Sequence, residues 1–156
     1  MNKMKWVVGC LVLMFCSVVN AAGQVAADFS FQDLDGKPHR LSDYRGKWVI
    51  VNYWSKDCSP CIQEIPVLKG VAQRYRNTAV VLGLDVGETP IAQMKQFVRQ
   101  RGINYLVAPT QDSTMFALGL IYGVPTTYII SPKGEIVDTH MGAITAQQLQ
   151  RYLSNR

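Results

Sequence analysis

Cysteine is scarce in this chain of 156 residues, and its scarcity narrows the possible chemistry. Of the four cysteines, Cys10 and Cys16 lie in an N-terminal segment typical of an export signal. If that segment is removed, Cys58 and Cys61 are the only thiols of the remaining domain. Structural zinc needs four ligands, and the two histidines of the chain stand far apart without ligand spacing, so the sequence predicts no metal site.

The chain also lacks an apolar run long enough to span a membrane. The run over residues 6–19 has 14 residues, whereas a spanning helix needs roughly 20. It follows Lys3 and Lys5 and precedes small residues, which is the order of an export signal. We therefore predict that residues 1–22 are a signal peptide cut near Ala21 or Ala22, with an uncleaved membrane anchor as the alternative. An anchor would be the protein's one contact with the membrane.

A strong excess of charge is absent as well. The formal net charge is +5, and without the two lysines of the leader 14 basic residues face 11 acidic ones, giving +3. The basic residues are scattered, so this excess is too small to predict nucleic-acid binding. Repeats and linkers rich in Pro, Gly or Ser are also missing, and residues 23–156 are predicted to form one domain.

Hydrophobic periodicity predicts that this domain belongs to the α/β class. Apolar runs at 47–54 and 78–86 indicate buried strands, and helical spacing follows each of them, at 60–75 and 91–101. Strands that alternate with helices predict a parallel pair. Further elements are predicted as an N-terminal hairpin over 29–41, a short strand at 105–107, a helix near 114–118, two antiparallel strands within 125–142 and a helix over 145–153.

The motif Cys58-Ser59-Pro60-Cys61 lies where the 47–54 strand meets the following helix. Unpaired amides and the helix dipole stabilise a thiolate at this terminus and lower the pKa of Cys58. A structural disulfide over so short a loop would add little stability. We therefore predict a redox-active disulfide, in which the exposed Cys58 attacks a partner disulfide and the shielded Cys61 resolves the mixed disulfide.

Two stretches resemble the TlpA/ResA branch of exported thiol-disulfide oxidoreductases, within the thioredoxin superfamily. They are DFSFQDLDGKPHRLSDYRGKWVIVNYWSKDCSPCIQEIPVL, residues 28–68, and YGVPTTYIISPKGEIVDTHMG, residues 122–142. The resemblance extends from residue 28 to about residue 153. It implies a thioredoxin-like fold, with a central mixed β-sheet flanked by helices and an N-terminal β-hairpin extension. It implies a protein-disulfide oxidoreductase without a cofactor.

The resemblance also implies roles for residues outside the cysteine motif. Pro125 would be a cis proline beside the sulfurs, with Val124 offering its backbone to an extended substrate and Thr126 next to both; the alternative is an ordinary proline at a strand start. Glu64 would be a buried acid that moves protons during exchange, rather than a solvated helix residue. Trp54 would either contact substrate or belong to the core.

Two positions depart from the pattern of the fold. Thioredoxin has a buried aspartate six residues before its first cysteine, where this chain has Asn52. Asp57 stands where the fold more often has tryptophan. A negative charge beside Cys58 opposes thiolate formation, so the sign of the net shift in its pKa stays open.

The resemblance implies partners and a location that the residues alone do not specify. The protein would act as a reductant of disulfides in apocytochrome c or other exported proteins. A membrane thiol-reducing transporter of the DsbD or CcdA type would reduce it again, and it would lie in the periplasm or on the outer side of the inner membrane. The residues themselves leave the direction of electron flow open. Two alternatives remain: a peroxiredoxin-like thiol peroxidase using Cys58, and a Cu(I) chaperone binding through Cys58 and Cys61, with His140 as a further candidate ligand.

Overall fold

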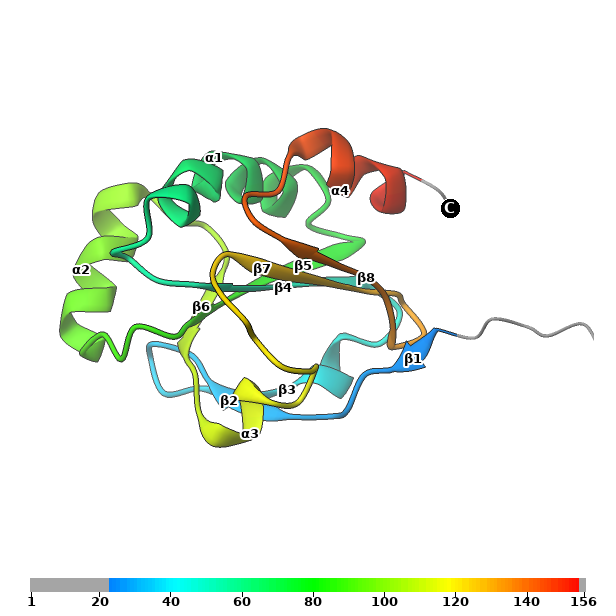
Figure 1. Cartoon of the computed structure of the whole chain (residues 1–156), viewed down its shortest axis with the longest axis horizontal. Helices are drawn as coiled ribbons and strands as arrows, with labels where there is room; N and C mark the ends of the chain where they lie inside the picture. The colour runs from blue at the N-terminus through cyan, green and yellow to red at the C-terminus, as the bar shows by residue number, and fades with distance from the viewer. Residues whose placement is uncertain (1–22, 155–156) are drawn as a thin grey trace, which may run out of the picture.

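A six-stranded mixed sheet forms the centre of the molecule. The computed structural model describes residues 23–154, so the predicted export signal lies outside the described residues. The strand order is β1-β8-β7-β4-β5-β6, and a separate two-stranded sheet joins β2 to β3. Helices α1 and α4 cover one face of the large sheet, whereas β2, β3 and α3 lie on the other (Figure 1). The predicted α/β class, the thioredoxin-like arrangement and the N-terminal hairpin are thus confirmed.

The elements have the following bounds. The strands are β1 (Gln24–Val25), β2 (Ser30–Gln32), β3 (Pro38–Arg40), β4 (Trp48–Trp54), β5 (Ala79–Asp85), β6 (Leu106–Pro109), β7 (Thr126–Ile130) and β8 (Glu135–Met141). The helices are α1 (Ser59–Arg74), α2 (Ile91–Arg101), α3 (Asp112–Met115) and α4 (Ala146–Leu153), with a 3-10 turn at Leu41–Tyr44.

The central strand β4 explains why the sequence is apolar there at nearly every position. It pairs in parallel with β5 and antiparallel with β7, so both of its edges are hydrogen-bonded, and a core cluster covers each of its two faces. Val49, Val51 and Tyr53 pack toward the hairpin side, together with Phe31. Ile50 packs on the opposite side against α1 and α4. The C-terminal end of β4 leads directly into the cysteine motif.

Two expected elements have other bounds in the structure, and one strand was not expected. The helix near 114–118 is the shorter α3, Asp112–Met115, and the strand expected at 105–107 is β6, Leu106–Pro109. The two-residue β1 was not predicted, because it is an exposed strand defined by its pairing with β8 rather than by a pattern of its own. Within residues 23–154, no helix is both long enough and apolar enough to cross a membrane.

Candidate active site

Cys58 is the N-cap residue of α1. Its backbone is extended, and its Sγ accepts the N–H of Cys61 at 3.3 Å. Pro60 occupies the first turn, where a missing N–H costs no helical hydrogen bond. The Cys58 sulfur therefore takes the place of a capping oxygen, and a negative charge on it would be stabilised by the helix terminus.

Cys58 and Cys61 form a disulfide, with their Cα atoms 5.3 Å apart. Cys58 is partly exposed, whereas Cys61 is 1 % exposed and packs among core residues. The expected asymmetry, an accessible sulfur with its partner buried one turn deeper, is present. Cys58 therefore carries the sulfur that is accessible from outside.

The loop that precedes β7 faces this disulfide. The peptide bond between Val124 and Pro125 is cis, and the carbonyl oxygen of Val124 lies 3.6 Å from Cys58 Sγ. The Pro125 carbonyl accepts the N–H of Gly142 at 2.8 Å, which attaches the loop to the end of β8. Thr126 is buried, and its hydroxyl donates to the carbonyl of Gly123 at 2.7 Å. The structure therefore brings Val124 to the cysteines, while the Thr126 side chain faces inward.

Glu64 lies in α1, one turn after Cys61, and is 2 % exposed. Its Oε1 accepts from the Asn52 side-chain amide at 2.7 Å, and its Oε2 accepts the N–H of Ile144 at 2.8 Å. Burial raises the pKa of Glu64, while the Ile144 N–H and the Asn52 amide oppose the rise. A buried carboxyl with a raised pKa is suited to accept and release a proton during exchange.

Asn52, Thr127 and Ile144 are site residues that sequence reasoning did not assign. The Asn52 amide donates to Thr127 Oγ1 at 3.0 Å as well as to Glu64, so it connects β4, β7 and α1. Asn52 was recognised only as a departure from thioredoxin. The sequence does contain a signal for its role: Asn52 is a polar residue inside an apolar strand covered on both faces. Such a residue needs a buried hydrogen-bond partner.

Trp54 belongs to the core in this structure. Its side chain is 2 % exposed and packs in one cluster with Cys61, Met94 and Val107, and its ring contacts Phe97. It therefore offers a client little surface and supports Cys61 from inside. Of the two roles considered for Trp54, burial favours the core.

Asp57 is exposed and pairs with the ammonium of Lys56, at 2.7 Å. A positive charge beside this carboxylate offsets part of its repulsion of a thiolate at Cys58, although exposed pairs are weak. His140 has both ring nitrogens in hydrogen bonds, to Ala143 and Gln148. No group of three or more His, Cys, Asp and Glu residues that could hold a metal occurs in the part of the chain that the structure describes.

Known proteins are similar to this chain over most of its length. The sequence profile of the AhpC/TSA family matches residues 22–139. The thiol-disulfide oxidoreductase ResA of Geobacillus kaustophilus is 35% identical over 137 residues, which cover 86% of this chain and 78% of the relative. ResA of Bacillus subtilis is 30% identical over 133 residues, 85% of this chain and 74% of the relative.

A solved structure has the same fold. The thiol:disulfide interchange protein of Chlorobium tepidum has a TM-score of 0.75 and 26% identity, over 86% of this chain and 97% of that one. The profile match spans most of the chain, and relatives at 30% identity or more align over most of their own length. The chain therefore belongs to the AhpC/TSA family and is a ResA-like protein-disulfide oxidoreductase.

Proposed function

We propose that this thiol-disulfide oxidoreductase is exported and reduces disulfides of exported proteins, among them apocytochrome c. The observation that carries the proposal is the position of Cys58: a partly exposed sulfur 3.6 Å from the Val124 carbonyl. None of the hydrogen bonds in residues 23–154 uses the Val124 N–H. A client strand could therefore pair with this backbone while its own sulfur approaches Cys58.

The reduction proceeds in two exchanges. The Cys58 thiolate attacks one sulfur of the client disulfide, and the other client sulfur leaves as a thiolate. Cys61 then gives its proton to the Glu64 carboxylate and attacks the Cys58 sulfur. This forms the Cys58–Cys61 disulfide and releases the first client sulfur as a thiolate, to which Glu64 can return the proton. Two electrons pass from the dithiol to the client, which leaves the protein in the oxidised form that the structure has.

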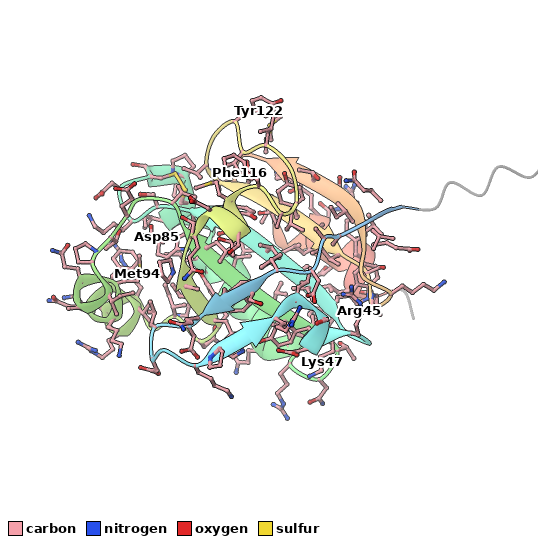
Figure 2. The ribbon with its side chains drawn as sticks, turned by 90° about the horizontal axis from the view of Figure 1, so that it is seen from below. Arg45, Lys47, Asp85, Met94, Phe116 and Tyr122 are labelled. Atoms are coloured by element: carbon pink, nitrogen blue, oxygen red, sulfur yellow. A yellow bond between two sulfur atoms is a disulfide. The ribbon has the colours of Figure 1, made fainter. Side chains whose placement is uncertain are left out.

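Apolar side chains beside the cis-proline loop support a protein client rather than a small disulfide. Phe116, Leu120 and Tyr122 are exposed on the segment before Val124, and Met141 is exposed opposite Thr126 on β8. We call these four residues the apolar rim. Tyr122 projects from its loop away from the body of the molecule (Figure 2). Exposed apolar groups that flank the cis-proline loop favour unfolded polypeptide segments as partners.

Export and the direction of electron flow are further parts of the proposal. The segment 1–22 has the order of an export signal, and one structural neighbour of 28% identity, with a TM-score of 0.70, is described as an exposed lipoprotein thioredoxin of Streptococcus pneumoniae. That similarity covers 83% of this chain and the whole of that one. An exported reductant needs an external source of electrons, for which we propose a membrane thiol-reducing transporter of the DsbD or CcdA type.

A trapping experiment tests the client. Cys61→Ser leaves Cys58 to attack but removes the resolving thiol, so mixed disulfides with exported proteins should accumulate and disappear on reduction. A Cys58→Ser, Cys61→Ser double variant is the matched control. If Cys61→Ser forms no more adducts than the double variant, the proposed exchange with proteins is wrong.

The reduction potential tests the direction. We expect the Cys58/Cys61 couple to lie below the potential of the glutathione pool, as a donor requires. A potential well above that pool would make the protein an oxidant. Catalytic consumption of hydrogen peroxide by the reduced protein would instead favour the thiol peroxidase.

A further inference from the structure

One peptide group connects His140 to the buried Glu64. The N–H of Ile144 donates to Glu64 Oε2 at 2.8 Å. The carbonyl of the same peptide unit belongs to Ala143, and it lies 3.3 Å from His140 Nε2. The imidazole and the carboxylate thus contact opposite ends of a single peptide bond, although they come from β8 and α1.

Hydrogen bonds on the other side of the ring fix its tautomer. The N–H of Thr145 can only donate, and it donates to Gln148 Oε1 at 2.9 Å. The amide nitrogen of Gln148 must then face His140 Nδ1, which lies 3.3 Å away and accepts. Nε2 consequently carries the hydrogen and donates it to the Ala143 carbonyl. Gln148 is itself held in place as part of the capping box of α4.

We propose that His140 is a positioning residue for Glu64, acting through the peptide group of residues 143–144. A hydrogen bond donated to the carbonyl polarises the peptide and strengthens its N–H as a donor to the carboxylate. This favours the ionised form of Glu64, which accepts the proton of Cys61. The inference rests on the proposed role of Glu64 as the proton carrier of the exchange.

Other titratable groups face the same region. Burial and the charge of Glu64 both raise the pKa of Tyr105, so the tyrosine stays neutral. Asp138 lies two residues before His140 on β8, and its carboxylate accepts the hydroxyl of Tyr152 at 2.7 Å. Burial raises the pKa of Glu64, whereas the Ile144 N–H and the Asn52 amide lower it. The Ile144 N–H is the donor that His140 controls.

Substitution at His140 tests the connection. Leucine removes the donor, so the pKa of Glu64, followed by carboxyl infrared or NMR titration, should rise by roughly half a unit. The acidic limb of the pH profile for resolution by Cys61 should move to higher pH by the same amount. His140→Gln can still donate to the Ala143 carbonyl and should restore at least half of the shift. His39→Leu replaces the other histidine, which binds Asp33 and Tyr44 in the hairpin region, and should leave both measurements unchanged.

Two further measurements separate the connection from general disruption. In a Glu64→Gln background, His140→Leu should not change the pH profile further. In the unsubstituted protein, nitrogen NMR should find the hydrogen of His140 on Nε2, and the ring signals should follow the titration of Glu64.

An Nδ1–H tautomer, or an unchanged pKa of Glu64 in a folded His140→Leu variant, overturns the inference and leaves the proposed reductase activity intact. Conversely, a protein that fails to form client adducts can still show the His140–Glu64 connection, so the two failures are distinguishable.

Discussion

The side-chain amide of Asn52 donates one hydrogen to Glu64 and the other to Thr127, at 2.7 and 3.0 Å. Both hydrogens of the amide are used, and the second oxygen of Glu64 is occupied by the Ile144 N–H. Because every polar partner of the carboxyl is a donor, these contacts favour its ionised form. Burial favours the neutral form and outweighs them, and the pKa of Glu64 is raised.

A first prediction concerns stability and pH. Because the pKa of Glu64 is higher in the folded than in the unfolded state, the folded state binds more protons between the two values. The free energy of unfolding therefore falls as pH rises through that window, by about 1.4 kcal/mol for each unit of pKa difference. The glutamine of Glu64→Gln cannot titrate, so the free energy of unfolding of this variant should not fall over that pH window. Urea denaturation of the oxidised proteins between about pH 4 and pH 8 measures it.

The glutamine of Glu64→Gln fits the place of the carboxyl if the side-chain amide of Asn52 rotates by 180°. The Asn52 oxygen then accepts a hydrogen bond from the NH₂ group of the glutamine. Glu64→Ala is the contrasting variant, because it leaves the Asn52 and Ile144 donors unpaired and should cost about 1–3 kcal/mol for each at every pH. If wild type and Glu64→Gln show parallel pH curves, Glu64 does not titrate differently on folding.

A second prediction follows from the same contact. Asn52→Asp places two buried carboxyl groups within hydrogen-bonding distance, so one proton should be shared and the pair should titrate with two separated apparent pKa values. The upper value should exceed the pKa of Glu64 in the wild type, and the acidic limb of Cys61 resolution should move to higher pH. Carboxyl infrared titration measures the two steps. A pair that loses both protons in one unshifted step would contradict the prediction.

The sequence alone predicted the frame of this site more fully than its hydrogen bonds. The apolar run of β4, the helical spacing after Pro60 and the exposed and buried positions of Cys58 and Cys61 are local properties that periodicity indicates. The partners of Glu64 are distant in sequence: Asn52 lies 12 residues away and Ile144 lies 80. Which polar groups meet in the core depends on strand register and helix packing, and a single sequence does not specify these.

The bounds of α3 also depend on contacts that a single sequence does not specify. The apolar residues near 114–118 suggested a helix, but α3 ends at Met115 and Phe116 and Leu120 are left exposed. A helix of four residues has little intrinsic stability, so its bounds are set by the cap at Gln111 and by surrounding contacts rather than by periodicity.

A third prediction concerns the apolar rim. Replacing Phe116 and Tyr122 by serine should lower kcat/KM for a protein disulfide about tenfold, because the client loses apolar contact worth about 1.4 kcal/mol. Reduction of oxidised glutathione should not change, since a small disulfide does not reach the rim. Stability should change by less than about 0.5 kcal/mol, as both side chains are exposed. Val25→Ser, at an exposed apolar position on β1, is the control. Equal losses with both disulfides would show that the rim does not select clients.

A fourth prediction tests the support beneath Cys61. Gly83 lies opposite Asn52 in β5, and a Cβ there would stand 2.9 Å from Trp54 Nε1 and 3.3 Å from the Tyr105 ring. The Trp54 ring is buried and the Tyr105 ring packs against the same cluster, so Gly83→Ala should cost about 1–3 kcal/mol of stability and slow resolution by Cys61, against which Trp54 packs.

Gly70→Ala is the matched control for this substitution. Gly70 lies within α1 and has nothing within 4 Å of an added Cβ, so alanine there should stabilise the protein by about 0.5–1 kcal/mol. Urea denaturation and single-turnover exchange measure the two effects. A Gly83→Ala protein as stable as the wild type, with unchanged resolution, would mean that the Trp54 ring can move aside without disturbing Cys61.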